Sequence, residues 1–298
     1  MSAADIDRKF LDPINPKFEP KPMIISAALT GAIPTKSRYP SLPTEPREIA
    51  ETALACAELG ASIAHLHMRD EDGIQVQDED RLLETIQLIR AENPALVICA
   101  TSTSRGATSI HERLTALRLP KPYLPDMVSL TLGSYNTPTG VNLNPREEIE
   151  AIAEHLAETG VAPELEIFEP GMMYTFFRLR QQQKIEKPAI VNILLGVEGA
   201  SPATARELLH IADLVPQDVE WAVAGIGAFQ KRTLWLGAVL GGNVRVGMED
   251  DPRGESDGWT NEDSVKRAVS AANAVERQIA SPEETRIRLG LVQPNQVA

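Results

Sequence analysis

The sequence predicts an α/β protein with the (β/α)8 TIM-barrel fold. Eight short β-rich runs recur at a mean spacing of about 30 residues, and helical patterns lie between them. The chain of 298 residues has a length typical of one such barrel. A doubly wound open sheet shares the alternation of strand and helix, but the count of eight strands favours the closed barrel.

The expected elements follow one another in a regular order. Helix-start signals stand at Asn144-Pro145-Arg146-Glu147, where Asn144 is the expected N-cap, and at Ser201-Pro202, which opens an expected helix over 203–214. Residues 1–21 are polar with no apolar run of a signal peptide, so we expect an N-terminal arm followed by one barrel domain over 22–298. The expected strands are Met23–Leu29, Ser62–Met68, Leu96–Thr101, Met127–Leu132, Pro163–Phe168, Ala189–Leu195, Glu220–Gly225 and Asn243–Met248.

Composition excludes several functional classes. The hydrophobic fraction of 43% can supply a large core, which excludes general disorder. Lys and Arg number 29 against 42 Asp and Glu, and the net charge of −13 disfavours binding to nucleic acids or anionic membranes. No apolar run approaches the length of about 18 residues that a membrane span needs. Two cysteines, Cys56 and Cys99, lie in apolar runs, so we expect reduced structural thiols and a cytoplasmic protein.

Polar side chains occupy one face of several expected strands, where a purely structural barrel would carry Val, Ile and Leu. Side chains alternate between the two faces of a strand, and Ala64, Leu66, Ile98 and Val128 give one face an apolar character. Burying polar groups costs several kcal/mol unless they have partners. An enzyme with its site at the C-terminal ends of the strands explains this pattern. The polar positions are His65, His67, Thr101, Ser129, Thr131, Glu164, Glu166, Arg245 and Glu249.

His65-Leu66-His67 places two imidazoles on one face of the second strand, close enough to share a metal ion. Such a pair alone is weak evidence, because core histidines are common. Glu249 strengthens it, since the eighth and second strands both flank the first in a closed barrel. Two His and one carboxylate leave coordination positions open and suit Zn2+ or another divalent cation. The remaining histidines fall in helical segments, which favours a mononuclear site over a binuclear one.

A charged cluster is expected beside this metal candidate. Arg245 lies four residues before Glu249, Asp250 follows directly, and Glu166 points inward from the fifth strand. An arginine between carboxylates keeps them ionised, and Asp250 beside a metal-bound carbonyl is a candidate general base. A structural ion-pair network is the alternative interpretation. Glu164 shares the face nearer the strand start and is expected to support the cluster.

Loops at the C-terminal ends of the strands supply candidate binding groups. Hydroxyls and loop amides at the third and fourth strands could hold a carboxylate, at Thr101, Ser102, Ser104, Ser129 and Thr131. Gly225 and Gly227 follow the seventh strand, where TIM barrels commonly bind phosphate, although tight turns explain glycines equally well. The long, Pro-rich loop from Thr30 to Pro43 is expected to cover the site.

Several segments resemble the β-keto acid cleavage enzymes, a family first described for a 3-keto-5-aminohexanoate cleavage enzyme of lysine fermentation. The resemblance runs from about Pro22 to Ile287. Its specific pieces are Ala27-Ala28-Leu29-Thr30-Gly31-Ala32, His65-Leu66-His67-Met68-Arg69-Asp70, Pro163-Glu164-Leu165-Glu166, Trp221-Ala222-Val223-Ala224-Gly225-Ile226-Gly227 and Arg245-Val246-Gly247-Met248-Glu249-Asp250.

The resemblance implies a barrel with Zn2+ on His65, His67 and Glu249, and a catalytic relay of Glu166, Arg245 and Asp250. It implies a reaction of a small β-keto acid with acetyl-CoA that yields acetoacetate and a new acyl-CoA by a Claisen and retro-Claisen route. It also implies a homotetramer. The expected partners are therefore these small molecules and further copies of the chain.

The chain departs from the family pattern at three places. Thr101-Ser102-Thr103-Ser104 stands where the family has a Ser-Thr-Gly-Gly loop for the substrate carboxylate, and Thr131 replaces an Asn. Ile33 stands where the first described member has a Glu that binds the substrate's amino group. An apolar Ile33 cannot pair with an ammonium group, so we do not expect the aminohexanoate to be the substrate.

Two alternative functions remain open from the sequence. A metal-dependent lyase or aldolase of the hydroxymethylglutaryl-CoA lyase kind also uses His-x-His in a barrel, but with the pair late in the chain and an Asp on the first strand. A non-catalytic ligand-binding barrel is the second alternative. Retention of Glu166, Arg245 and Asp250 disfavours it.

Overall fold

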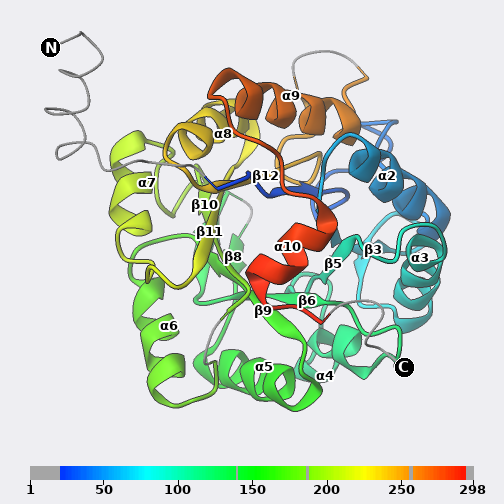
Figure 1. Ribbon diagram of the computed structural model, residues 1–298. Coiled ribbons are helices and arrows are strands. Elements are labelled where there is room, and N and C mark those ends of the chain that lie inside the picture. Colours follow the sequence, from blue (N-terminus) through cyan, green and yellow to red (C-terminus); the bar gives the residue numbers. More distant parts are fainter. Residues whose placement is uncertain (1–20, 139, 186–187, 255–257, 293–298) are drawn as a thin grey trace, which may run out of the picture.

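A computed structural model describes residues 21–138, 140–185, 188–254 and 258–292, and its central feature is a closed parallel barrel of eight strands (Figure 1). The predicted TIM-barrel fold is confirmed. The expected arm falls on residues 1–21, all of which except Lys21 lie outside the described ranges. The barrel strands are, in chain order, β1 (Ile25–Ala28), β2 (Ile63–Leu66), β5 (Val97–Ala100), β6 (Met127–Thr131), β9 (Ala162–Ile167), β10 (Ile190–Leu195), β11 (Glu220–Gly225) and β12 (Asn243–Val246).

Helices surround the barrel and cover the outer face of the sheet (Figure 1). Outward apolar side chains such as Leu66, Ile98 and Leu165 are buried between strands and helices in the main core cluster. Among the described residues, no helix combines the length and the apolar character needed to cross a membrane. The helices are α2 (Pro46–Glu58), α3 (Glu79–Glu92), α4 (Ile110–Arg113), α5 (Arg146–Thr159), α6 (Met172–Gln181), α7 (Ala205–Ala212), α8 (Gln230–Val239), α9 (Asn261–Ala274) and α10 (Pro282–Leu289).

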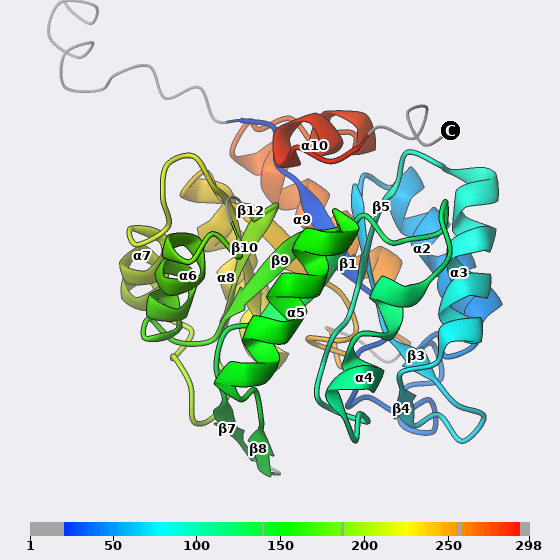
Figure 2. The ribbon, with the colours of Figure 1, turned by 90° about the horizontal axis from the view of Figure 1, so that it is seen from below.

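The two ends of the barrel differ. Helix α10 lies across the N-terminal end of the strands, and its Leu289 belongs to a second apolar cluster with inward residues such as Ile63, Val97 and Ile190 (Figures 1 and 2). The opposite end carries two small hairpins, β3–β4 (Met68–Arg69 and Gln75–Val76) and β7–β8 (Tyr135–Thr137 and Gly140–Asn142). The polar interior therefore opens only toward the end where TIM-barrel sites form.

All eight strands lie where the sequence predicts them, and no strand end differs from its predicted position by more than two residues. The eighth strand stops at Val246 because Gly247 has a φ of +141°, and a Cβ there would meet the Ala28 carbonyl oxygen at 2.2 Å. The chain leaves the strand at this glycine, and the Glu249 amide again donates to the Ala28 carbonyl at 3.1 Å. Glu249 thus follows the strand end on a fixed turn.

The predicted starts of two helices are wrong. Helix α7 begins at Ala205, because Thr204 caps it by accepting a hydrogen bond from the Glu207 amide. Helix α5 begins at Arg146 with Pro145 at the N-cap position. The Asn144 side chain instead joins loop contacts, since it accepts from Arg113 Nη2 at 2.8 Å.

Candidate active site

Three predicted metal ligands meet at the C-terminal end of the barrel. Strands β12, β1 and β2 are neighbours, so Glu249 comes to lie beside His65 and His67. His67 Nε2 lies 3.3 Å from Glu249 Oε1, and His65 Nε2 lies 3.7 Å from Glu249 Oε2. The two Nε2 atoms are 3.2 Å apart. The structure thus brings together the three residues whose metal-binding role the sequence predicts.

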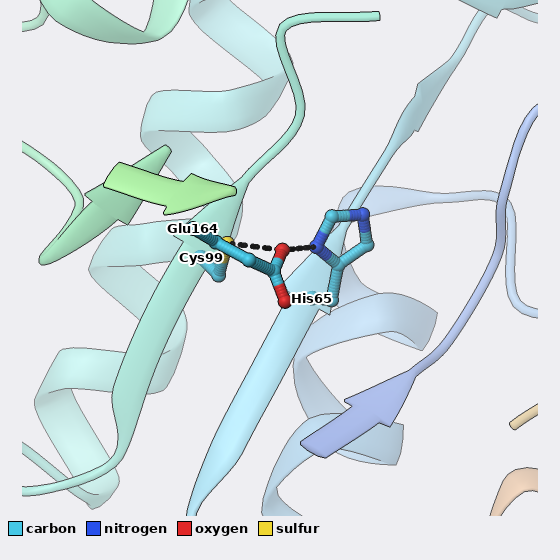
Figure 3. Close-up of side chains that lie close together, drawn as sticks. All are labelled: His65, Cys99 and Glu164. Atoms are coloured by element: carbon cyan, nitrogen blue, oxygen red, sulfur yellow. Dashed lines mark hydrogen bonds and ion pairs between the residues drawn. The ribbon is translucent and has the colours of Figure 1, made fainter. Parts of the chain in front are cut away.

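The other nitrogen of each imidazole faces an acceptor oxygen. His67 Nδ1 lies 2.8 Å from Gln75 Oε1, on the β3–β4 hairpin. His65 Nδ1 lies 3.3 Å from Glu164 Oε2, an ion-pair contact drawn in Figure 3. An acceptor at Nδ1 favours the tautomer that carries its proton there, which leaves the Nε2 lone pair free. Both lone pairs then point toward the same space.

Glu164 is itself held in place by a buried thiol (Figure 3). Cys99 Sγ donates to Glu164 Oε2 at 3.2 Å, and both side chains are buried with His65. Burial alone would raise the pKa of Glu164, but contacts with His65 and the charge of Arg245 lower it. Burial, followed by the charge of Glu164, raises the pKa of the Cys99 thiol well above its ordinary value. Cys99 therefore stays protonated and supports Glu164, although His65, Cys99 and Glu164 also lie close enough to hold a metal ion.

The trio of His65, His67 and Glu249 fits a divalent cation. Their ligand atoms all lie within 4.8 Å of one another. Two imidazole lone pairs at 3.2 Å repel each other unless a positive charge lies between them. Glu249 Oε2 is buried and has no hydrogen-bond partner among the described residues, which is costly unless a cation satisfies it. Two nitrogens and a carboxylate suit Zn2+ and leave coordination positions for a substrate.

Arg245 links the cluster to Asp250 and Glu166. It is 2% exposed, donates from Nε and Nη2 to the two Asp250 carboxylate oxygens at 3.0 Å each, and reaches Glu166 Oε1 at 3.2 Å. A further bond runs to Glu249 Oε1. Burial alone would lower the pKa of Arg245, but the surrounding carboxylates raise it well above its ordinary value. The guanidinium therefore holds its charge and fixes the carboxylates around it.

Asp250 keeps a pKa close to neutrality. Burial raises the pKa of Asp250 to about 6, and the charge of Glu249 adds to this rise, while Arg245 opposes it. A carboxylate with such a pKa is ionised at pH 7 and still takes up a proton readily. Glu166, on the far side of Arg245, accepts a hydrogen bond from Thr131 Oγ1 at 2.6 Å. This arrangement can remove and return a proton next to a bound cation.

A cavity of about 980 Å³ opens above these groups. Of the predicted substrate-binding residues, Ile33, Thr101 and Thr131 line it, with Ala32 and Ile33 coming from the loop that the sequence expects to cover the site. Ser102, Ser104 and Ser129 are not part of the lining. The hydroxyl of Ser102 donates to the Ser129 carbonyl, and that of Ser104 donates to Asn142 Oδ1 at 3.0 Å. These two serines shape the loop instead of facing the cavity.

Gly225, the last residue of β11, and Gly227, just after the strand, have local structural roles. A Cβ on Gly225 would meet the Phe229 carbonyl oxygen at 2.6 Å, so this glycine allows the following turn to pack closely. Gly227 lines the cavity with a φ of +61°, but its amide donates to the Asp250 carbonyl at 2.7 Å. The prediction that their amides bind a phosphate finds no support in these contacts.

Sequence reasoning missed several residues of the site. The pattern of barrel strands does not predict Gln75, because this residue reaches His67 from a short hairpin outside the barrel. Tyr135 lies on the β7–β8 hairpin, whose short strands give no hydrophobic periodicity from which the sequence would predict them. Three further arginines line the cavity, Arg105, Arg232 and Arg253. A search for cations in the loops after strands would have found Arg105 and Arg253, whereas Arg232 lies in the first turn of α8.

Comparison with known proteins agrees with this geometry. The family model described as beta-keto acid cleavage enzyme matches residues 22–291. The chain belongs to the β-keto acid cleavage enzyme family. The predicted resemblance is thereby confirmed over most of the chain, and this barrel is an enzyme.

Named relatives of the enzyme cover nearly all of it. A 3-keto-5-aminohexanoate cleavage enzyme of Fusobacterium nucleatum is 36% identical over 273 residues, which is 90% of this chain and 98% of the relative. A 3-oxoadipate:acetyl-CoA acetyltransferase of Cupriavidus necator is 30% identical and covers 91% of this chain and 95% of its own length. Among solved structures, ObcA with oxaloacetate superposes with a TM-score of 0.70 at 18% identity, over 85% of this chain and 68% of ObcA. The last comparison supports the fold alone.

Proposed function

We propose that this enzyme exchanges acyl groups between a β-keto acid and acetyl-CoA, giving acetoacetate and a new acyl-CoA. The observation that carries the proposal is the position of Asp250, a buried carboxylate held by two hydrogen bonds from Arg245, next to Glu249 and on the cavity wall. The names of the relatives, which include a 3-oxoadipate:acetyl-CoA acetyltransferase, agree with this chemistry.

The chemistry starts at the α-carbon between the two carbonyls of the keto acid. A divalent cation such as Zn2+ on His65, His67 and Glu249 would supply Lewis-acid polarisation of the substrate carbonyl. Asp250 takes the α-proton, because its carboxylate lies on the cavity wall directly after Glu249 and burial raises its pKa above the ordinary value. Arg245 holds Asp250 by two hydrogen bonds and orients its carboxylate toward the cavity.

The bonds then change in a balanced order. The α-carbon attacks the acetyl carbon of acetyl-CoA, and the CoA thiolate leaves. The thiolate attacks the original keto carbonyl, and the bond between that carbon and the α-carbon breaks. The new acyl-CoA carries the tail of the keto acid, while acetoacetate keeps its carboxylate and α-carbon. The proton on Asp250 returns to the α-carbon, so no further reactant is needed.

Two arginines at the mouth of the cavity suit the phosphates of CoA. Arg232 and Arg253 follow β11 and β12, where TIM barrels commonly hold phosphate groups. Arg253 lies beside Gly227, because a Cβ on that glycine would approach Arg253 Nη2 to 2.8 Å. We therefore assign phosphate binding to these side chains and not to the Gly225 and Gly227 amides.

The keto acid has no ammonium group in this proposal. Ile33 lines the cavity with an apolar side chain, which cannot neutralise a charge there. The remaining properties are expectations from the family resemblance: Zn2+ as the ion, a homotetramer and a cytoplasmic location. Metal analysis of the purified enzyme and light scattering after gel filtration test the first two.

The decisive experiment follows the acetyl carbons. Acetyl-CoA labelled with 13C in both acetyl carbons is incubated with a panel of β-keto acids, and products are identified by mass spectrometry. The proposal requires both labels in carbons 3 and 4 of acetoacetate and none in the new acyl-CoA. Cleavage that proceeds without acetyl-CoA would indicate the lyase alternative. Metal binding without any turnover would indicate a ligand-binding barrel.

A further inference from the structure

The cavity extends beyond the catalytic groups to a second positive charge. Arg105 stands in the loop after β5 and lines the cavity together with Tyr135 and Asn142 of the β7–β8 hairpin. This hairpin and α4, which follows the loop, lie at the open end of the barrel (Figure 2). Arg245 and Asp250 lie on the wall of the same cavity. One cavity therefore holds both the reacting centre and Arg105.

Arg105 has no counter-charge within residues 21–138, 140–185, 188–254 and 258–292. No carboxylate there lies within ion-pair distance of its guanidinium. The neighbouring Arg113, by contrast, is bound by Glu148 Oε2 at 2.6 Å and Asn144 Oδ1 at 2.8 Å. In a protein with a net charge of −13, a half-buried arginine that lines a cavity and has no carboxylate within ion-pair distance among the described residues is set up to bind an anion.

Tyr135 adds a neutral donor beside this charge. Its hydroxyl accepts a hydrogen bond from Asn142 Nδ2 at 2.9 Å, and its ring stacks on Phe168 with centroids 3.9 Å apart. Burial, followed by the charge of Glu166, raises the pKa of Tyr135, while the charge of Arg105 acts in the opposite direction. The phenol therefore keeps its proton, and Tyr135 lines the same cavity as Arg105 and Glu166.

We propose that the substrate is a β-keto dicarboxylic acid. Its second carboxylate, at the end of the molecule away from the α-carbon, would bind to Arg105 and to the Tyr135 hydroxyl. This inference rests on the proposed function and specifies its substrate class. Apolar residues such as Leu194 and Val197 line the same cavity and suit the methylene groups between the two ends.

The phosphates of acyl-CoA are the other source of negative charge at this cavity. Arg232 and Arg253 follow β11 and β12, whereas Arg105 follows β5. In the closed barrel order β5 and β11 are separated by β6, β9 and β10 on one side and by β2, β1 and β12 on the other. Arg105 thus comes from the opposite side of the barrel from the two arginines assigned to CoA.

Two substrates of equal chain length test the inference. 3-Oxoadipate ends in a carboxylate where 3-oxohexanoate ends in a methyl group. We expect the wild-type enzyme to prefer 3-oxoadipate, and Arg105→Met to lower kcat/KM for 3-oxoadipate by about 10- to 150-fold, as expected for a lost charged hydrogen bond. The value for 3-oxohexanoate and the KM for acetyl-CoA should stay within about threefold. Arg232→Met is the matched control, which should raise the KM for acetyl-CoA alone.

Several results would overturn the inference. These are equal wild-type kcat/KM for the two keto acids, an equal loss on both in Arg105→Met, or a rise only in the KM for acetyl-CoA. Binding of adipate and hexanoate, measured by calorimetry without acetyl-CoA, separates this inference from the proposed function. A preference for adipate that disappears in Arg105→Met supports the carboxylate site even if no acyl exchange occurs, and the absence of that preference contradicts it.

Discussion

Replacing Glu164 with glutamine should weaken metal binding without changing the shape of the barrel. Glu164 Oε2 lies 3.3 Å from His65 Nδ1 in a fully buried setting, so solvent does not screen the interaction. Partners of this kind change metal affinity by about 10- to 100-fold, or about 1.4–2.7 kcal/mol. Glu164→Gln keeps an acceptor oxygen and should lie near tenfold. Glu164→Ala leaves His65 without an acceptor and should approach 100-fold.

The assay is competition for Zn2+ between the apo-enzyme and a coloured chelator. Cys99→Ala is the matched control, because it removes the thiol donor to Glu164 and leaves the contact with His65 in place. We expect this control to change the affinity by less than about threefold. Wild-type affinity in both Glu164 variants, with unchanged circular dichroism, would refute the view that Glu164 orients His65.

Three further predictions concern proton transfer, the metal and acid stability. Asp250→Asn should keep metal but slow the exchange of the α-protons of the keto acid in D2O by about 10²- to 10⁴-fold, measured by NMR; unchanged exchange would remove Asp250 from the mechanism. Removing the metal by chelation should lower the Tm, since a ligand at 1,000 times its Kd stabilises the folded protein by about 4 kcal/mol. His67→Ala should show this lower Tm and no change of Tm on addition of Zn2+. A Tm that rises with Zn2+ as in the wild type would contradict the assignment of His67 as a metal ligand. Burial alone would raise the pKa of Glu220, but its contacts with Lys21 and Arg288 lower it below the ordinary value of 4.5. Ionised Glu220 therefore stabilises the folded protein fully above pH 4.5, and this contribution is lost as the pH falls through the lower pKa of the folded state. Glu220→Gln should therefore cost about 0.5–1 kcal/mol in urea unfolding at pH 7 and much less at pH 3, and an equal cost at both would contradict this.

Periodic features of the sequence predict the fold well. The eight strands and their polar inward positions follow from alternation and spacing, which the barrel preserves. The juxtaposition of Glu249 with His65 follows as well, because closure makes the first and last strands neighbours. Each of these depends on rules that act along a whole strand.

Features that depend on single local contacts could not be predicted in this way. Gln75 reaches His67 only through a hairpin of two short strands. Both Ser201 and Thr204 are of residue types that favour the N-cap position, and in the structure Thr204 caps α7. The amide of Gly227 is used by the Asp250 carbonyl, a contact between two loops distant in sequence. Such outcomes depend on tertiary packing, which overrides local preference.

Closure of one barrel end by α10 has a consequence for the order of events during turnover. Within the described residues, Leu289 and the apolar residues beneath it fill that end, and the cavity lies at the opposite end, on the β7–β8 side. Under the proposed function, the keto acid binds beside Asp250 and Arg245, and the bulkier CoA binds after it on the outer part of the cavity, at Arg232 and Arg253. This placement predicts that the new acyl-CoA leaves before acetoacetate, so the products are released in the reverse of the order in which the reactants bind.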